Sequence, residues 1–137
     1  MTKPRVLFLC THNSARSQMA EGLLRHLGGD GFEAYSGGLE ATMVHPLALW
    51  AMAEVGIDIS GQCSKALTEY LGRMEFRYVI TVCGNAEERC PLFPGAVTRL
   101  HWPFEDPAAA AGTEAVRLAQ FQRVRDQIAA RITAWLA

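Results

Sequence analysis

The alternation of apolar and polar positions along the chain predicts most of its helices and strands. Residues 5–9 (RVLFL) form an apolar run without alternation, which is typical of a strand covered on both faces. From residue 17 the apolar positions recur every three or four residues until Gly28 and Gly29, and this period predicts a helix over 17–28. The same patterns predict six further elements: strands over 32–36, 78–82 and 96–100, and helices over 46–55, from Ser64 to residue 71, and from Thr113 onward.

Strands that alternate with helices indicate a parallel sheet with right-handed crossovers, which is a doubly wound α/β fold. The 137 residues suffice for one core, so we expect a single domain over 1–137, with a four-stranded parallel sheet and helices on both faces. Ligands of such sheets bind at the carboxyl ends of the strands. Cys10 ends the first strand, Cys83 follows the third and HWPFEDP (101–107) follows the fourth, so three distant segments should meet at one edge.

The composition argues against several classes of partner. Lys and Arg number 13 against 14 Asp and Glu, and a valine interrupts the longest basic cluster at 123–125, so we expect neither nucleic acid nor a membrane as partner. No apolar run approaches the length of a membrane span and no secretion signal is evident, which favours a cytoplasmic protein. The four cysteines, at positions 10, 63, 83 and 90, are then expected to be reduced and chemically active rather than paired in a structural framework.

The segment CTHNSARS, residues 10–17, joins the first strand to the first helix and has the features of an anion site. The backbone N–H groups of such a loop and the positive end of the helix dipole point at one centre, where they bind a tetrahedral oxyanion. Arg16 adds a forked donor, and Asn13 tolerates the left-handed backbone that a tight loop needs. The same field stabilises a thiolate, which makes Cys10 a nucleophile at neutral pH. The expected oxyanion-binding residues are Thr11, His12, Asn13, Ser14, Ala15, Arg16 and Ser17.

These segments resemble a known family. CTHNSARS resembles the C-x5-R-S phosphate loop of the low-molecular-weight tyrosine phosphatase fold, and the pair Asp106-Pro107 is also typical of that fold. Essentially the whole chain is similar to the thioredoxin-coupled arsenate reductases built on this fold. The resemblance implies arsenate as substrate, thioredoxin as partner with thioredoxin reductase and NADPH upstream, and no bound cofactor; we expect a monomer. The similar segments are SQMAEG (17–22), EVGIDIS (54–60), the Cys83/Cys90 pair, HWPFEDP (101–107) and FQRVRD (121–126).

The resemblance also implies a reaction sequence. Cys10 would attack arsenic, while Asp106 acts as the general acid that protonates the leaving oxygen. Cys83 would then attack the Cys10–arsenic adduct, releasing arsenite and leaving a Cys10–Cys83 disulfide, and Cys90 would attack Cys83 in turn. A tyrosine phosphatase has no use for the last two thiols, and two alanines at 108–109 stand where such enzymes place aromatic residues.

The spacing of the last two cysteines predicts a conformational change. Residues 85–90 (NAEERC) are good helix formers, so we expect a short helix that begins after Gly84. A helix over 83–90 would hold the Cα atoms of Cys83 and Cys90 roughly 10 Å apart at about 1.5 Å per residue. A disulfide tolerates about 7 Å at most, so forming it would unwind this segment.

Other interpretations remain open at the level of sequence. The loop alone could serve a phosphatase of small phosphoesters, because arsenate and phosphate are near-isosteres, or a non-enzymatic sensor of redox state or oxyanions. Cys83 and Cys90 could instead be core residues or zinc ligands, and Asp106 could be a turn residue before proline. The electron donor could be a low-molecular-weight thiol acting with glutaredoxin or mycoredoxin.

The resemblance raises the question of a metal. Some members of the resembled family bind potassium near the loop through an asparagine, a glutamate, a serine and an aspartate. Asn13, Glu21 and Ser36 match the first three, but Lys65 stands at the fourth position. Its ammonium would repel a cation and could pair with Glu21, so we expect no metal.

Three further side chains carry no assigned chemistry, and the side chain of one loop residue has two possible roles. His26 and His45 are expected at the surface, and Cys63 is expected to be structural. His12 lies within the loop, where it either tunes the local field or faces solvent.

Overall fold

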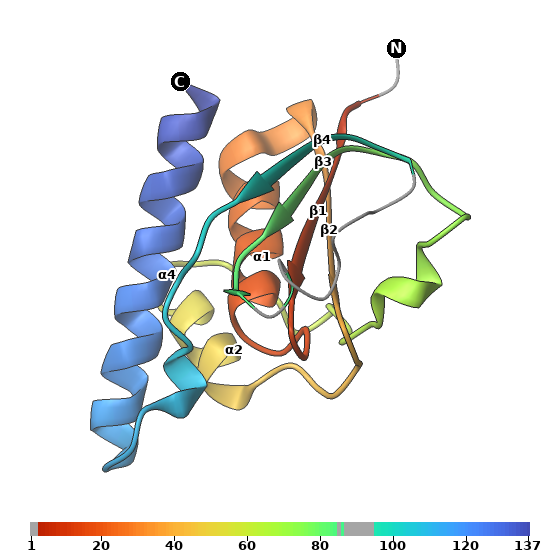
Figure 1. Ribbon diagram of the computed structural model, residues 1–137. Helices are drawn as coiled ribbons and strands as arrows, with labels where there is room; N and C mark the ends of the chain where they lie inside the picture. The colour runs from red at the N-terminus through yellow and green to blue at the C-terminus, as the bar shows by residue number, and fades with distance from the viewer. Residues whose placement is uncertain (1–2, 85, 87–94) are drawn as a thin grey trace.

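One four-stranded sheet forms the centre of the molecule. The computed structural model describes residues 3–84, 86 and 95–137. All strands are parallel and lie in the order β2-β1-β3-β4 (Figure 1). The central residues of β1 have no exposed surface, because both faces of the sheet are covered. The strands are β1 (Arg5–Cys10), β2 (Glu33–Gly38), β3 (Phe76–Thr81) and β4 (Ala96–His101).

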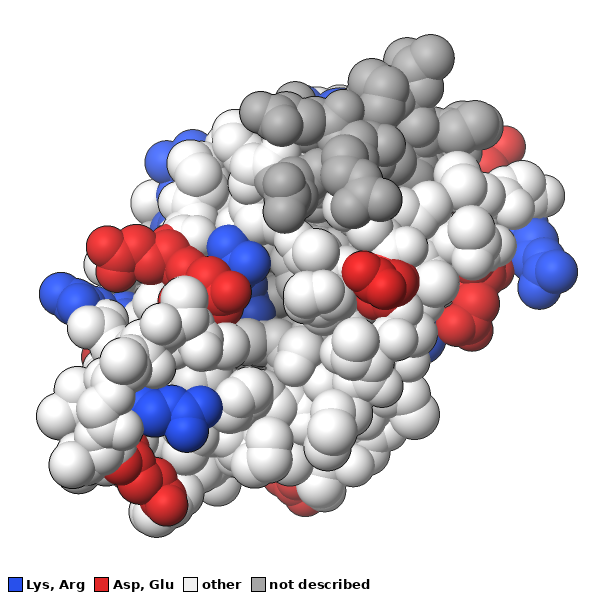
Figure 2. All heavy atoms as spheres, turned by 60° about the horizontal axis from the view of Figure 1, so that its bottom comes forward, with Lys and Arg blue, Asp and Glu red and all other residues white. Residues whose placement is uncertain are grey.

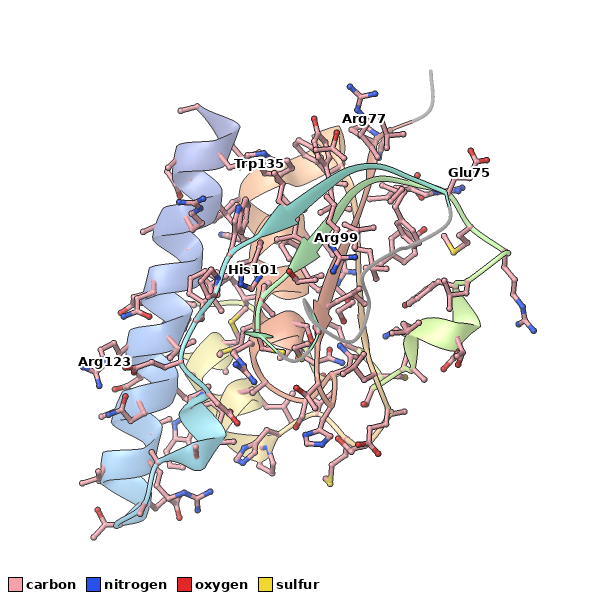
Figure 3. The ribbon with its side chains drawn as sticks, in the orientation of Figure 1. Glu75, Arg77, Arg99, His101, Arg123 and Trp135 are labelled. Atoms are coloured by element: carbon pink, nitrogen blue, oxygen red, sulfur yellow. The ribbon has the colours of Figure 1, made fainter. Side chains whose placement is uncertain are left out.

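Two long helices cover one side of the sheet (Figure 1). α1 (Arg16–Gly28) packs against β1 and β2, and α4 (Glu114–Leu136) packs along α1. Trp135 of α4 lies edge-on to Tyr78 of β3, with ring centroids 4.9 Å apart, whereas Arg123 points away from the sheet (Figure 3). α2 (Pro46–Ala53) packs against both of these helices. The fully buried stripe of α4 consists of Phe121, Val124, Ile128 and Ile132.

The segment around η2 (Leu67–Glu69) covers the opposite face. Side chains alternate along a strand, so Ser36, which donates to Glu21 of α1, and Tyr35 point to opposite faces. Tyr70 packs its ring against Tyr35, with centroids 6.0 Å apart, and its hydroxyl donates to the carbonyl of Ser36 at 2.9 Å. These contacts anchor the segment to β2.

The predicted helix from Ser64 to residue 71 is wrong, because only the 3-10 turn η2 forms there. Ser64 does not cap it: its hydroxyl donates to the carbonyl of His12 at 3.0 Å and accepts the N–H of Thr42 at 2.8 Å. Contacts with distant segments therefore override the local preference of this serine for a helix start.

The other predicted elements are present, with boundaries that differ by a few residues. β3 starts two residues earlier than expected, and α2 ends two residues earlier. Thr113 caps α4 as expected, since its hydroxyl accepts the N–H of Val116. Gly84 and Ala86 are helical, but residue 85, residues 87–90 and with them Cys90 lie outside the described residues. The parallel, doubly wound fold class is confirmed.

The topology creates one switch point. β1 lies between β2 and β3, so the chain moves to one side of β1 first and to the other side afterwards. Open α/β sheets bind ligands at the carboxyl ends of the strands beside such a point, which here are β1 and β3. Figure 2 brings the lower side of Figure 1 forward, and the acidic and basic side chains on this face are interspersed. No described helix combines the length and the apolar character needed to cross a bilayer.

Candidate active site

The loop between β1 and α1 is fixed by the side chain and backbone of Asn13. This residue has a φ of 50°, the one positive φ among the described non-glycine residues, which agrees with the predicted left-handed position. Gln18 donates to the Asn13 carbonyl at 3.0 Å and to its Oδ1 at 2.9 Å, and the N–H of Lys65 donates to the same Oδ1 at 2.8 Å. These hydrogen bonds fix the shape of the loop. Asn13 and Gln18 are both buried, where a polar group without a hydrogen bond would destabilise the fold.

Cys10 points into this loop and meets a hydroxyl. Its Sγ lies 2.7 Å from the Oγ of Ser17, and the amide of Asn13 donates to the same Oγ at 2.8 Å. An amide nitrogen can only donate, so the hydrogen of the Ser17 hydroxyl is available for the sulfur. Ser17 also lies in the first turn of α1, whose dipole is positive at this end. The hydroxyl and the helix terminus therefore both present positive partial charge to the sulfur.

Gly38 allows a second strand end to approach the loop. A Cβ at this position would lie 2.7 Å from the backbone nitrogen of Asn13 and 2.9 Å from the backbone carbon of His12. The backbone of His12 is also held from outside, because its carbonyl accepts from Thr42 at 3.2 Å and from Ser64 at 3.0 Å. The sequence offered no signal for these contacts, since they join segments at least 25 residues apart.

Arg16 and Asp106 face the thiol across a small pocket. Arg16 donates to the carbonyl of Phe104 at 3.1 Å, and its other terminal nitrogen lies 3.9 Å from Asp106 Oδ2. Asp106 also caps η3 (Pro107–Ala109), accepting the N–H of Ala108 at 3.0 Å, so it is a turn residue and a pocket residue at once. The pocket has a volume of about 90 Å³ and is lined by Cys10, His12, Ser14, Ala15, Arg16, Asp106 and Ala108.

Cys83 brings a second thiol to the loop. It is buried just after β3, and its sulfur lies 3.3 Å from the hydroxyl of Thr11, the residue that follows Cys10. The N–H of Ala86 also points at this sulfur, at 3.5 Å. The structure therefore brings Cys10, Arg16, Cys83 and Asp106 to one edge of the sheet, as the sequence predicts, and Cys90 lies outside the described residues.

The arrangement can perform nucleophilic chemistry on a tetrahedral oxyanion, and comparison with known proteins places the chain in a family. Residues 5–137 match the family described as low molecular weight phosphotyrosine protein phosphatase. The chain belongs to the low molecular weight phosphotyrosine protein phosphatase family.

Several relatives in this phosphatase family are named arsenate reductase. The protein of Shouchella clausii is 52% identical over 133 residues, which are 96% of this chain and 94% of that protein. The protein of Bacillus subtilis is 49% identical over 128 residues, which are 93% of this chain and 91% of that protein.

Solved structures are similar over nearly all of this chain. One, described as an arsenate reductase in the phosphate binding state, has a TM-score of 0.79 at 36% identity and covers 96% of this chain and 95% of that one. The thioredoxin-dependent arsenate reductase of Corynebacterium glutamicum has a TM-score of 0.71 at 33% identity, covering 98% of this chain and 60% of that one.

Lys65, expected to take the place of a potassium ion, and Glu21, which matches one of its ligands, both make other contacts in this structure. Glu21 pairs with Arg25 at 2.7 Å and accepts from Ser36 at 2.5 Å. The expected Lys65–Glu21 pair is wrong, because the Lys65 ammonium donates to the carbonyl of Cys63 at 2.5 Å. The carboxylate oxygens of Glu21 therefore already accept hydrogen bonds from Arg25 and Ser36. Among the described residues, no three His, Cys, Asp or Glu side chains cluster as metal ligands do.

The burial of two residues differs from what the sequence predicts. His45, expected at the surface, is half-buried: it packs on Phe121 and accepts the N–H of Leu47. A histidine directly before a proline that opens a helix was the signal that could have revealed it. Cys63, expected to be structural, has an exposed side chain, and only its backbone carbonyl serves the scaffold.

Proposed function

We propose that this protein reduces arsenate to arsenite with electrons from thioredoxin. The observation that carries the proposal is the Cys83 sulfur, which lies 3.3 Å from the hydroxyl of Thr11 beside the nucleophile Cys10. Hydrolysis of a phosphoester needs a water at this point, whereas a reduction needs a second thiol. The relatives named arsenate reductase and the thioredoxin-dependent structure support the same choice.

The first step forms a sulfur–arsenic bond. The loop N–H groups and Arg16 hold the oxygens of arsenate, and the thiolate of Cys10 attacks arsenic. One oxygen leaves as water after taking a proton from Asp106, which shares the pocket with Cys10 and Arg16. Arsenic remains in oxidation state five in this adduct.

The second step transfers the electrons. The thiolate of Cys83 attacks the sulfur of Cys10, and the sulfur–arsenic bond breaks with its electron pair going to arsenic. Arsenic is thereby reduced to oxidation state three and leaves as arsenite. The two sulfurs are oxidised together, which leaves a Cys10–Cys83 disulfide.

The third step regenerates the nucleophile. Cys90 attacks Cys83, so that Cys10 leaves as a thiolate and a Cys83–Cys90 disulfide forms. Thioredoxin then reduces this disulfide with its own two thiols. The spacing of Cys83 and Cys90 predicts that the segment between them, most of which lies outside the described residues, unwinds for this step. We place the reaction in the cytoplasm, where thiols stay reduced, and in a monomer.

A phosphatase acting on small phosphoesters is the second candidate. The pocket binds a tetrahedral oxyanion with the same donors, and one similar structure is described as a phosphate binding state. Ala108 lines the pocket where an aromatic side chain would hold a tyrosine ring. Phosphate release that persists after loss of Cys83 and Cys90 would reveal this activity.

The direct test is arsenite production from arsenate with thioredoxin, thioredoxin reductase and NADPH. We expect turnover with the complete system, one arsenite at most per chain without it, and none with Cys10→Ser. Cys63→Ser is the matched control, because this cysteine is exposed and outside the pocket, and it should behave as wild type. Equal turnover without thioredoxin, or with Cys10→Ser, would refute the proposal.

A further inference from the structure

His45 joins the oxyanion loop to α2, although it lies outside the chemistry described above. Its backbone N–H donates to the carbonyl of Ser14 at 2.9 Å. Its ring nitrogen Nδ1 accepts the backbone N–H of Leu47 at 3.1 Å. Because Pro46 opens the helix and has no N–H, this is the first donor that the N-terminus of α2 offers. One residue therefore holds both the loop and the helix.

The hydrogen bond to Nδ1 defines the charge state of the ring. A nitrogen that accepts carries no hydrogen, so Nε2 carries it and the imidazole is neutral. The ring packs on Phe121 of α4 with centroids 4.7 Å apart, and it faces Arg117 of α4 and Asp106 of the loop before η3. Burial and the Arg117 charge lower the pKa of His45, and Asp106 opposes them only in part.

We propose that His45 is a positioning residue: its neutral imidazole holds the oxyanion loop and the start of α2 in the working geometry, and protonation releases them. A protonated Nδ1 is a donor and would face the donor N–H of Leu47. It would also place a positive charge at the positive end of the α2 dipole, beside Arg117. Ser14 lines the pocket, and its carbonyl would lose the hydrogen bond from the backbone N–H of His45 that holds it in place.

The direction of the pH effect follows from the lowered pKa. Above about pH 6.5 His45 is neutral in both the folded and the unfolded chain, and the cap is intact. Below that value the unfolded chain takes up a proton before the folded one, so the free energy of unfolding falls as the pH drops. The ring of the folded chain takes up its own proton only at a lower pH, because its pKa is lowered, and arsenate reduction should decline there, a consequence that rests on the proposed function.

His45→Asn separates positioning from simple loss of structure. The side-chain oxygen of asparagine can accept the N–H of Leu47, but it does not titrate, and it should keep activity at pH 8 within about threefold. Its kcat/KM for arsenite formation should lose the acid decline that His45 causes in wild type. His26→Asn is the control, because His26 is exposed on α1 and should leave the wild-type profile unchanged.

An NMR titration tests the same linkage without arsenate. Ala15 shares a peptide unit with the Ser14 carbonyl. In wild type the chemical shift of the Ala15 amide should change with pH at the same midpoint as the His45 ring. In His45→Asn this transition should be absent. A chain that forms no arsenite but shows this shift would refute the proposed function and support the inference. The inference would be overturned if kcat/KM fell in acid for His45→Asn as it does for wild type. It would also be overturned if the chemical shift of the Ala15 amide did not change at the midpoint of the His45 ring.

Discussion

At the scale of single residues, the hydroxyl of Ser17 contacts the sulfur of Cys10. Ser17 receives a hydrogen bond from Asn13 and can pass its own hydrogen to Cys10, 2.7 Å away. Because the amide fixes the direction of the hydroxyl, the donor is in place before the thiol loses its proton. The geometry therefore points a hydrogen-bond donor at the buried sulfur.

Ser17→Ala should slow alkylation of Cys10 by iodoacetamide at pH 7 by about tenfold, since a hydrogen bond to a charged group contributes roughly 1.5–3 kcal/mol. The rate is measured by mass spectrometry of the Cys10 peptide. Ser60→Ala, at an exposed serine away from the pocket, is the control and should alkylate as wild type does. An alkylation rate for Ser17→Ala within twofold of wild type would contradict this role.

At the scale of elements, the site depends on how closely the end of β2 approaches the loop. Gly38→Ala would put a Cβ 2.7 Å from one backbone atom of the loop and 2.8 Å from the carbonyl oxygen of Glu40. Neither contact is a flexible side-chain end, so the loop itself has to move. Thermal unfolding should show a loss of about 1–3 kcal/mol, as overpacking usually causes.

The same substitution should weaken binding of inorganic phosphate, measured by calorimetry, because the loop that holds the anion is displaced. Gly61→Ala is the matched control: a Cβ at Gly61 meets nothing within 4 Å, and its φ is not in the left-handed range. If both variants bind phosphate equally well, the close approach of Gly38 does not shape the site.

The sequence predicts elements and the loop well for a physical reason. The period of apolar residues reports burial directly, and Asn13 reports a left-handed backbone because few residue types tolerate one. Three contacts were not predictable in this way: Ser64 with His12, the backbone of His45 with Ser14, and Gly38 with the loop. Each joins segments far apart in the chain, and no local pattern encodes which backbone group will need a partner.

At the scale of the whole molecule, the order of the strands brings the two thiols together. β1 and β3 are neighbours in the sheet although about 70 residues separate Cys10 from Cys83. The alternation of strands and helices predicts this meeting, since parallel strands share their carboxyl edge. On the face of the sheet opposite α1 and α4, Tyr70 is buried and its hydroxyl donates a hydrogen bond to the backbone of β2.

The stability of the whole molecule should fall in alkali because of Tyr70. Burial, with the charges of Glu21 and Glu69, raises the pKa of this hydroxyl. Above about pH 10 the unfolded chain loses the proton and the folded chain keeps it, so the free energy of unfolding decreases as the pH rises. Urea unfolding between pH 8 and 10.5 should show a shallower decrease for Tyr70→Phe; identical slopes would contradict the assignment.

The most direct test of the proposed reaction is the disulfide expected between Cys10 and Cys83. Cys90→Ser should stop the reaction after one turn, so incubation with arsenate alone should yield one arsenite per chain. Peptide mass spectrometry should then find a Cys10–Cys83 disulfide, in this variant and equally when Cys63→Ser is added. Arsenite released without that disulfide, or a Cys10–Cys63 disulfide in its place, would contradict the account.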